Sequence, residues 1–323
     1  MSDKPKIALY WCASCGGCEE AVVDLAEGVL DLVNLVDIVF WPVALDMKRS
    51  DVEQLPDSAL VASLINGAIR NEEQEEMAHL LRRKSKYVIA FGSCAQYGGI
   101  PGLANLFFRE QILNAVFRES PSTEVAAEFP RRLTDGDHSL TLPEFSEKVR
   151  TLDQVIEVDY YIPGCPPSTK VVGSALLALV KGELPPLGGV LAPDHALCED
   201  CSRKESKPEK LDLETLRRVH QIEVDPERCL LAQGIVCLGM GTRAGCDAVC
   251  IKGNMPCTGC GGPTTNVRDH GAKLLSALAS NLSASEESAI DAVLEALPDV
   301  VGTLYRYSVP GSLMQGAVRP GER

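Results

Sequence analysis

Residues 6–18 read Lys-Ile-Ala-Leu-Tyr-Trp-Cys-Ala-Ser-Cys-Gly-Gly-Cys, an apolar run that ends in three closely spaced cysteines. We expect residues 6–11 to form a buried strand. In residues 19–32 the apolar side chains recur every three or four positions, which predicts one amphipathic helix directly after the cysteines. A strand followed by a helix is the repeating unit of parallel sheets, so this stretch predicts an α/β fold.

The same alternation continues along the first half of the chain. Apolar runs predict further strands at residues 36–41, 87–91 and 155–161, and helical patterns cover residues 72–84 and 170–181. Strands that alternate with helices favour a mostly parallel sheet with helices on both faces. The sequence therefore predicts a flavodoxin-like parallel sheet domain, which we assign to residues 1–185.

Two stretches depart from this alternation. Residues 107–153 are rich in charged and polar side chains, and we interpret them as a surface insertion without assigned chemistry. Residues 184–189, Leu-Pro-Pro-Leu-Gly-Gly, predict a linker. A smaller, irregular domain rich in Gly and Cys should follow over residues 186–323, and two helical stretches near residues 272–279 and 286–297 should close it.

The composition narrows the class of protein. The 323 residues carry a net charge of -14, and the sequence pI is near 4.9. Because phosphate binding requires clustered Lys and Arg, this charge argues against nucleic acids and anionic membranes as partners. No run reaches the roughly 18 apolar residues of a membrane helix, and the first residues show no export signal, so we expect a cytoplasmic protein.

Thirteen cysteines are the most unusual feature of the composition. In a reducing compartment they should not form a disulfide framework, and an odd number cannot pair completely within one chain. Thiolate sulfur is the ligand that iron-sulfur clusters require, and four cysteines complete one 4Fe-4S cluster. Twelve of the thirteen cysteines can be divided into three sets of four.

The first set follows the ends of three predicted strands. Because ligands in such sheets lie beyond the carboxyl ends of the strands, the loops that follow them should meet in one site. Glycines beside these cysteines would let the backbone approach a cluster and present N–H groups to its sulfurs. The set consists of Cys15, Cys18, Cys94 and Cys165.

The second domain holds the other eight cysteines. We divide them by sequence order into Cys198, Cys201, Cys229 and Cys237 for one cluster, and Cys246, Cys250, Cys257 and Cys260 for the other. Interleaved pairings remain open at this point. His195 lies three residues before the first of these cysteines and is an alternative ligand, because imidazole can replace thiolate on a cluster.

Other uses of these residues are possible. Eight cysteines with C-x-x-C spacing could also form two structural zinc knuckles, but a set that spans three loops at a sheet edge is unusual for zinc. Cys12 directly follows the first predicted strand, and we interpret it as a buried, inert thiol. The remaining histidines have no cysteine neighbours, and we assign them no role.

At this point the motifs resemble a known family. Ser-Cys-Gly-Gly-Cys-Glu-Glu at residues 14–20, Gly-Ser-Cys-Ala at 92–95 and Pro-Gly-Cys-Pro-Pro at 163–167 resemble the motifs of nickel-iron hydrogenase small subunits that bind the proximal cluster. Residues 233–246 and 253–260 are similar to the region of the medial and distal clusters. The chain most resembles the cytoplasmic group 3 branch, the methyl-viologen-reducing or F420-non-reducing hydrogenases.

The resemblance implies three 4Fe-4S clusters in a defined order. The set Cys15, Cys18, Cys94 and Cys165 would be proximal, and is called the proximal set below. The set of Cys246, Cys250, Cys257 and Cys260 would be medial, and the set of Cys198, Cys201, Cys229 and Cys237 distal. The exported branch of the family has a three-iron medial cluster and a His ligand on the distal one, whereas here Cys250 would supply a fourth medial ligand.

The resemblance also implies partners. The nickel-iron centre would belong to a separate large subunit, and this chain would transfer electrons from it to an acceptor subunit. That acceptor could be ferredoxin-like or contain flavin, with heterodisulfide reductase, NAD(P)-linked and deazaflavin-linked enzymes as the candidates. Two alternatives stay open: an electron-transfer subunit of a related oxidoreductase whose large subunit lacks nickel, and a zinc-stabilised interaction protein.

Overall fold

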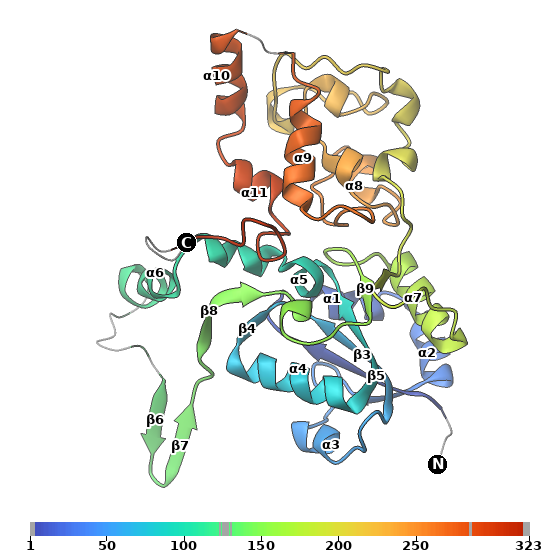
Figure 1. Cartoon of the computed structure of the whole chain (residues 1–323), viewed down its shortest axis with the longest axis vertical. Helices are drawn as coiled ribbons and strands as arrows, with labels where there is room; N and C mark the ends of the chain where they lie inside the picture. The colour runs from blue at the N-terminus through green and yellow to red at the C-terminus, as the bar shows by residue number, and fades with distance from the viewer. Residues whose placement is uncertain (1–3, 123, 125–128, 130, 284–285, 319–323) are drawn as a thin grey trace.

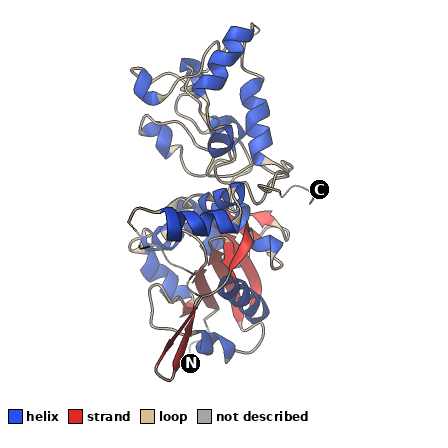
Figure 2. Cartoon of the chain, turned by 90° about the vertical axis from the view of Figure 1, so that its left-hand side faces the viewer, coloured by secondary structure: helices blue, strands red, loops and turns tan. Residues whose placement is uncertain are grey.

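The computed structural model describes residues 4–122, 124, 129, 131–283 and 286–318. Figures 1 and 2 show two regions: a sheet with its helices, and a second region of short helices and loops that contains none of the sheet. The domain limits predicted at residues 185 and 186 remain a prediction. The last residue of the predicted linker, Gly189, begins a short edge strand of the sheet, β10 (Gly189–Val190).

The sheet has six strands, and every pair of neighbours is parallel. Its spatial order is β2-β1-β3-β5-β9-β10. The other five strands are β1 (Lys6–Trp11), β2 (Asp37–Phe40), β3 (Leu60–Asn66), β5 (Ser85–Phe91) and β9 (Tyr160–Ile162). Counted along the chain this order is 2-1-3-4-5-6, which is flavodoxin-like, so the predicted α/β fold is confirmed.

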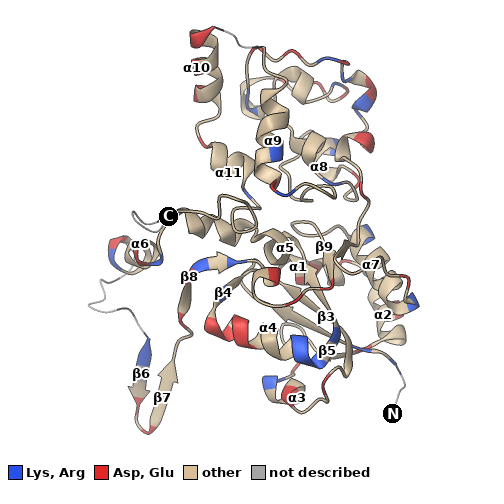
Figure 3. Ribbon diagram, in the orientation of Figure 1, with Lys and Arg blue, Asp and Glu red and all other residues tan. Residues whose placement is uncertain are grey.

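Helices cover both faces of the sheet. On one face, α1 (Gly17–Val23), α2 (Gly28–Leu35) and α7 (Thr169–Lys181) pack their apolar side chains into one hydrophobic cluster. On the other face lie α3 (Arg49–Glu53), α4 (Glu72–Lys84) and α5 (Ser93–Tyr97). Figure 3 shows that α4 is acidic in its first turn and basic in its last, which complements the helix dipole.

Three sequence predictions differ from the structure. The helix predicted over residues 19–32 is broken in two: α1 ends at Val23, and α2 begins at Gly28 after a turn in which Ala26 has a φ of 51°. The strand predicted at residues 155–161 is shorter, since Asp159 instead hydrogen-bonds Val88 through both its backbone and its carboxylate. The central strand β3 was not predicted, because it buries polar residues such as Ser63 and Asn66.

The predicted insertion lies beside the sheet domain. It contains α6 (Arg109–Asn114), a π-helical turn (Ala115–Glu119), and a hairpin of β6 (Arg132–Asp135) and β7 (His138–Thr141) that projects away from the sheet (Figure 1). Its last strand, β8 (Phe145–Arg150), pairs with β4 (Ile69–Asn71) and attaches the insertion to the sheet domain. Residues 123, 125–128 and 130 of the insertion lie outside the described part of the chain.

The second region is built from short elements. Five 3-10 turns, Leu197–Glu199, Lys204–Ser206, Val219–Gln221, Leu231–Gln233 and Leu238–Gly241, alternate with loops, followed by α8 (Val249–Lys252), α9 (His270–Ala279), α10 (Glu287–Ala296) and α11 (Val300–Leu304). The positions of α9 and α10 match the two predicted helical stretches. Three small hydrophobic clusters hold this region together.

Residues after α11 return to the sheet domain (Figure 1). The N–H of Gly99 donates to the carbonyl of Tyr307 at 3.0 Å, and the N–H of Ala317 donates to the carbonyl of Asn105 at 2.7 Å. Pro310 packs so closely on Gly98 that a Cβ there would lie 2.2 Å from the proline ring. The end of the described chain therefore joins the two regions.

Candidate iron-sulfur sites

The four cysteines of the proximal set converge at the carboxyl edge of the sheet. They follow the ends of β1, β5 and β9, in the loops after these strands or in the first turns of α1 and α5, next to the second region (Figure 1). Burial, reinforced by the neighbouring thiols of the set, raises the pKa of Cys18. The same two causes raise the pKa of Cys94 and of Cys165 to about 11. Four thiols close enough to influence one another form the donor set that an iron-sulfur cluster needs.

Two glycines make room for these sulfurs. At Gly92, where φ is +83°, a Cβ would lie 2.3 Å from the Sγ of Cys18. At Gly99, where φ is +56°, a Cβ would lie 2.3 Å from the Sγ of Cys94. Any larger residue would collide with a thiol and would also be strained in this left-handed conformation.

The end of β3 anchors the loop that carries Cys15 and Cys18. The hydroxyl of Ser14 donates to the Oδ1 of Asn66 at 2.9 Å, and the Nδ2 of Asn66 donates to the Oε1 of Glu19 at 2.6 Å. The indole N–H of Trp41 donates to the other carboxylate oxygen of Glu19, which is 4% exposed. The sequence pattern does not single out Glu19, because its partners are distant in the chain, and the neighbouring Glu20 is exposed.

Cys12 is separate from the proximal set. It is 5% exposed and packs among core side chains such as Phe40 and Ile65. Its N–H donates to the carbonyl of Asn66 at 2.8 Å, so its backbone continues the pairing between β1 and β3. This environment fits the predicted inert thiol.

The distal set lines one cavity in the second region. Burial raises the pKa of Cys198 to about 12, with further contributions from the thiols of Cys237, Cys229 and Cys201, while Lys207 opposes the increase. The N–H of Arg203 donates to the Sγ of Cys201 at 3.4 Å. The cavity is lined by the four cysteines together with Arg203, Lys207, Leu230, Leu231, Met240 and Ile251.

The medial set lines a neighbouring cavity. Burial raises the pKa of Cys260 to about 11, and a backbone N–H of Cys165 contacts its sulfur. Cys250 is exposed, whereas Cys257 is buried. The cavity is lined by the four cysteines together with Leu197, Thr242, Ala248, Ile251, Thr258 and Gly261. The eight cysteines are thus gathered in two groups that follow sequence order.

His195 lies outside the lining of both cavities. Its Nε2 is 2.9 Å from the Oδ1 of Asp200, and about a third of its side chain is exposed. The structure therefore gives this histidine a carboxylate partner on the protein surface. Its use as a cluster ligand stays a prediction.

Contacts between ligand loops connect the three sets. The hydroxyl of Ser93, next to Cys94, donates to the carbonyl of Cys260. The N–H of Cys257 donates to the Sγ of Cys237 at 3.4 Å. The proximal set is thus in contact with the medial set, and the medial set with the distal one.

The residues present fit iron-sulfur clusters. Each cavity of the second region is surrounded by four cysteines and several apolar side chains, with Arg203 and Lys207 added at the distal cavity and two threonines at the medial one, which suits a thiolate-held, partly desolvated cluster. Within the described residues, no three His, Cys, Asp or Glu side chains are close enough to share a single metal ion.

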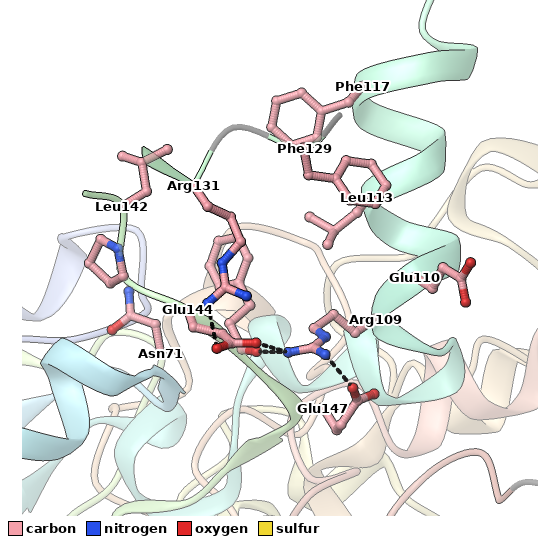
Figure 4. A pocket seen from close by; sticks show the side chains of 12 residues that line it. Asn71, Arg109, Glu110, Leu113, Phe117, Phe129, Arg131, Leu142, Glu144 and Glu147 are labelled. Carbon is pink, nitrogen blue, oxygen red and sulfur yellow. Dashed lines mark hydrogen bonds and ion pairs between the residues drawn. The ribbon is translucent and has the colours of Figure 1, made fainter. Parts of the chain in front are cut away.

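A separate cavity of about 570 Å³ lies in the insertion and contains no cysteine. Figure 4 shows Arg109 between Glu144 and Glu147, with distances of 3.1 and 2.7 Å, and Arg131 also paired with Glu144. Leu113, Phe117 and Phe129 form its apolar wall. It shares no lining residue with the cysteine sites, and we assign it no chemistry.

The described residues include no helix that is both long and apolar enough to cross a membrane.

Comparison with known proteins identifies the family. The profile of the family described as NADH ubiquinone oxidoreductase, 20 Kd subunit, matches residues 15–179, which include the whole proximal set. The chain is 40% identical to the iron-sulfur subunit of the F420-non-reducing hydrogenase of Archaeoglobus profundus, over 96% of this chain and 97% of the relative. It is also 40% identical to a vhu subunit of the F420-non-reducing hydrogenase of Methanocaldococcus jannaschii, over 96% of both chains.

A more distant likeness concerns the fold alone. The chain superposes on a [NiFeSe] hydrogenase of Desulfovibrio vulgaris Hildenborough with a TM-score of 0.54 and 16% identity, covering 82% of this chain and 95% of that one. The predicted resemblance is confirmed by the more similar relatives. The chain belongs to the family of F420-non-reducing hydrogenase iron-sulfur subunits and is the small subunit of a hydrogenase.

Proposed function

We propose that this chain holds three 4Fe-4S clusters on twelve cysteines and transfers electrons from a nickel-iron large subunit to an acceptor subunit. The observation that carries the proposal is the grouping of the cysteines: one set of four at the sheet edge and two sets of four around neighbouring cavities. When bound, such clusters supply one-electron redox chemistry. The order proximal, medial, distal follows the contacts between the sets.

The protein's own groups support this role by holding and shielding the ligands. Backbone N–H groups of Arg203 and Cys257 donate to the distal sulfurs of Cys201 and Cys237, which stabilises their negative charge. Two glycines of the sheet edge keep space for two proximal sulfurs. Apolar side chains around the distal and medial cavities limit the access of water.

The exposed ligands indicate where partners would cover the chain. Cys15 of the proximal set and Cys250 of the medial set are exposed in the isolated subunit. We propose that the large subunit, which would contain the nickel-iron centre, covers the proximal side. The acceptor would dock at the distal side, and a link to heterodisulfide reductase is our preferred assignment because the related subunits belong to F420-non-reducing hydrogenases. We place the complex in the cytoplasm.

Metal analysis of the anaerobically purified complex tests the cluster content. We expect about twelve irons and as many acid-labile sulfides per copy of this chain, after subtraction of the clusters of other subunits, with nickel in the large subunit. Iron without nickel would favour a related oxidoreductase, and zinc in place of iron would overturn the cluster assignment.

Paired cysteine variants test the residue assignment. Cys165→Ser should lose about four irons, because one proximal ligand is removed. Cys12→Ser should keep the full iron content, since this thiol packs in the core apart from the proximal set. Equal iron contents in the two variants would contradict the proposed proximal set.

A further inference from the structure

Arg203 is a buried cation that has no acidic partner in the part of the chain that the structure describes. The residue is 5% exposed. Its guanidinium donates to four neutral oxygens: the carbonyls of Asp225 and Arg228 at 3.3 Å, the carbonyl of Ile251 at 3.0 Å, and the Oδ1 of Asn254 at 2.8 Å. Among the described residues no carboxylate forms an ion pair with it. Burying a charge costs free energy unless it is compensated, so this arrangement requires a negative group nearby.

The distal set provides that negative group. Arg203 lines the distal cavity together with the four cysteines, and its own N–H donates to the Sγ of Cys201. Lys207 lines the same cavity from a more exposed position, and its charge acts on the thiol of Cys198. Four thiolates around an iron-sulfur core carry a net negative charge, which these two cations face.

The medial cavity is not lined by cations. Its lining contains no Lys or Arg. The closest charged residue in sequence, Asp247, is exposed and already paired with Lys170 at 2.8 Å. Ile251 lines both cavities, and backbone N–H groups contact cysteine sulfurs in both sets. These features therefore cannot make the electrostatic surroundings of the two sites different. Arg243, next to the lining residue Thr242, is also buried, but it is paired with the carboxylate of Asp194 at 2.9 Å. Arg203 and Lys207 are therefore the cations that line the distal cavity and have no counterpart in the lining of the medial one.

The acidic residues near the distal set do not cancel this charge. Glu199 and Asp200 lie between two distal cysteines, but both are exposed, and Asp200 is paired with His195. Exposed charges are screened by water and salt, whereas a buried guanidinium is screened much less. The net field at the distal cavity is therefore dominated by the buried cation.

We propose that Arg203, assisted by Lys207, raises the reduction potential of the distal cluster above that of the medial cluster. Adding an electron makes a cluster more negative, and a fixed positive charge beside it stabilises the reduced form. Electron transfer from the medial to the distal site is then favourable, which directs electrons toward the acceptor side. The inference rests on the proposed function, because it requires clusters in both cavities.

Redox titration of the anaerobic complex, followed by EPR, tests the proposal. In Arg203→Gln we expect the ratio of reduced to oxidised distal cluster, at a fixed solution potential, to fall at least tenfold, equivalent to about 59 mV for one electron. Arg203→Lys, which keeps the charge, should keep the ratio of reduced to oxidised distal cluster close to that of the unaltered complex. Lys207→Gln should shift it in the same direction by a smaller factor that decreases at high salt.

The control is Lys181→Gln, which removes the same charge at an exposed position in the last turn of α7, in the sheet domain. It should leave the ratios of reduced to oxidised medial cluster and of reduced to oxidised distal cluster unchanged. Unmoved distal ratios in Arg203→Gln and Lys207→Gln, or equal shifts of the medial and distal clusters, would overturn the inference. If Arg203→Gln loses iron and its distal cluster cannot be titrated, the ratio measured in Lys207→Gln decides whether the inference holds. Absence of clusters from the unaltered complex would instead refute the proposed function.

Discussion

The hydroxyl of Ser93 donates a 2.5 Å hydrogen bond to the backbone carbonyl of Cys260, so a residue of the sheet edge is bonded directly to a medial ligand. Ser93 is 1% exposed, and its own N–H is bonded to the carbonyl of Gly164. The first bond joins the segment of Cys94 to a medial ligand, and the second joins it to the segment of Cys165. The hydroxyl therefore fixes the second region against the sheet domain at the point where the two sets meet.

Ser93→Ala should destabilise the complex by about 1–2 kcal/mol, because the buried carbonyl of Cys260 loses its donor. Thermal unfolding under anaerobic conditions should show a fall of a few degrees in Tm. Ser280→Ala removes an exposed hydroxyl that bonds only within its own turn, and it should leave Tm unchanged. Equal Tm values for both variants would show that the Ser93 bond contributes nothing.

Gly92→Ala should prevent assembly of the proximal site, because the added Cβ would lie 2.3 Å from the Sγ of Cys18. We expect about four fewer irons per chain in metal analysis. Gly182→Ala is the matched control: its φ is also positive, at +70°, but no atom lies within 4 Å of the added Cβ. Iron loss in both variants would point to backbone strain alone as the cause.

Asn66→Ala should destabilise the sheet domain by roughly 2–3 kcal/mol, since the buried carboxylate of Glu19 and the hydroxyl of Ser14 each lose a partner. Ser63→Ala, on the same strand, breaks only the bond to the hydroxyl of Ser85 and should cost about 1 kcal/mol. Thermal unfolding compares the two. A smaller effect at Asn66 than at Ser63 would contradict its role as the anchor of the cysteine loop.

Cys250→Ala should convert the medial cluster from four irons to three, because it removes the exposed fourth ligand. EPR of the oxidised variant should then show a 3Fe-4S signal that the unaltered complex lacks. Cys12→Ala changes a cysteine outside the three sets and should produce no such signal. A 3Fe-4S signal native to the unaltered complex would disprove the four-cysteine medial site.

The stability of the second region should fall in mild acid because of His270. This residue is 5% exposed, and burial lowers its pKa from 6.5 to about 4. The folded state therefore resists a proton that the unfolded chain accepts, so the histidine reduces the free energy of unfolding as pH falls from about 7 to 4, by about 3 kcal/mol at most. His270→Gln should flatten the dependence of Tm on pH in this range.

The control for that comparison is His220→Gln, a change at an exposed histidine. It should keep the pH dependence of the unaltered complex. Identical slopes for the two variants would show that acid weakens the protein through other groups, such as the cysteine ligands.

The strands and helices with clear local signals could be predicted from the sequence. The predicted limits of β1 and α4 match the structure, because apolar side chains fill β1 and because Asn71 caps α4 by accepting from the N–H of Gln74 through its side chain. The central strand β3 could not, since Asn66 and Ser63 find their partners in distant parts of the chain. A local pattern gives no sign of such pairing.

The same distinction applies to the candidate sites. Cysteine spacing was sufficient to propose the three sets, because ligands of one type stand out in any sequence. The residues that surround the cysteine sets could not be predicted from the sequence. Glu19 hydrogen-bonds Asn66 across 47 positions, and Arg203 hydrogen-bonds Asn254 across 51. These contacts exist only after the chain has folded.

The return of residues 305–317 to the sheet domain also constrains the order of synthesis. Tyr97 and Asn105 receive their hydrogen bonds from Gly311 and Ala317, more than 200 positions later in the chain. Because a ribosome delivers the N-terminal part first, this surface of the sheet domain stays uncovered until residues 311–317 have been synthesised.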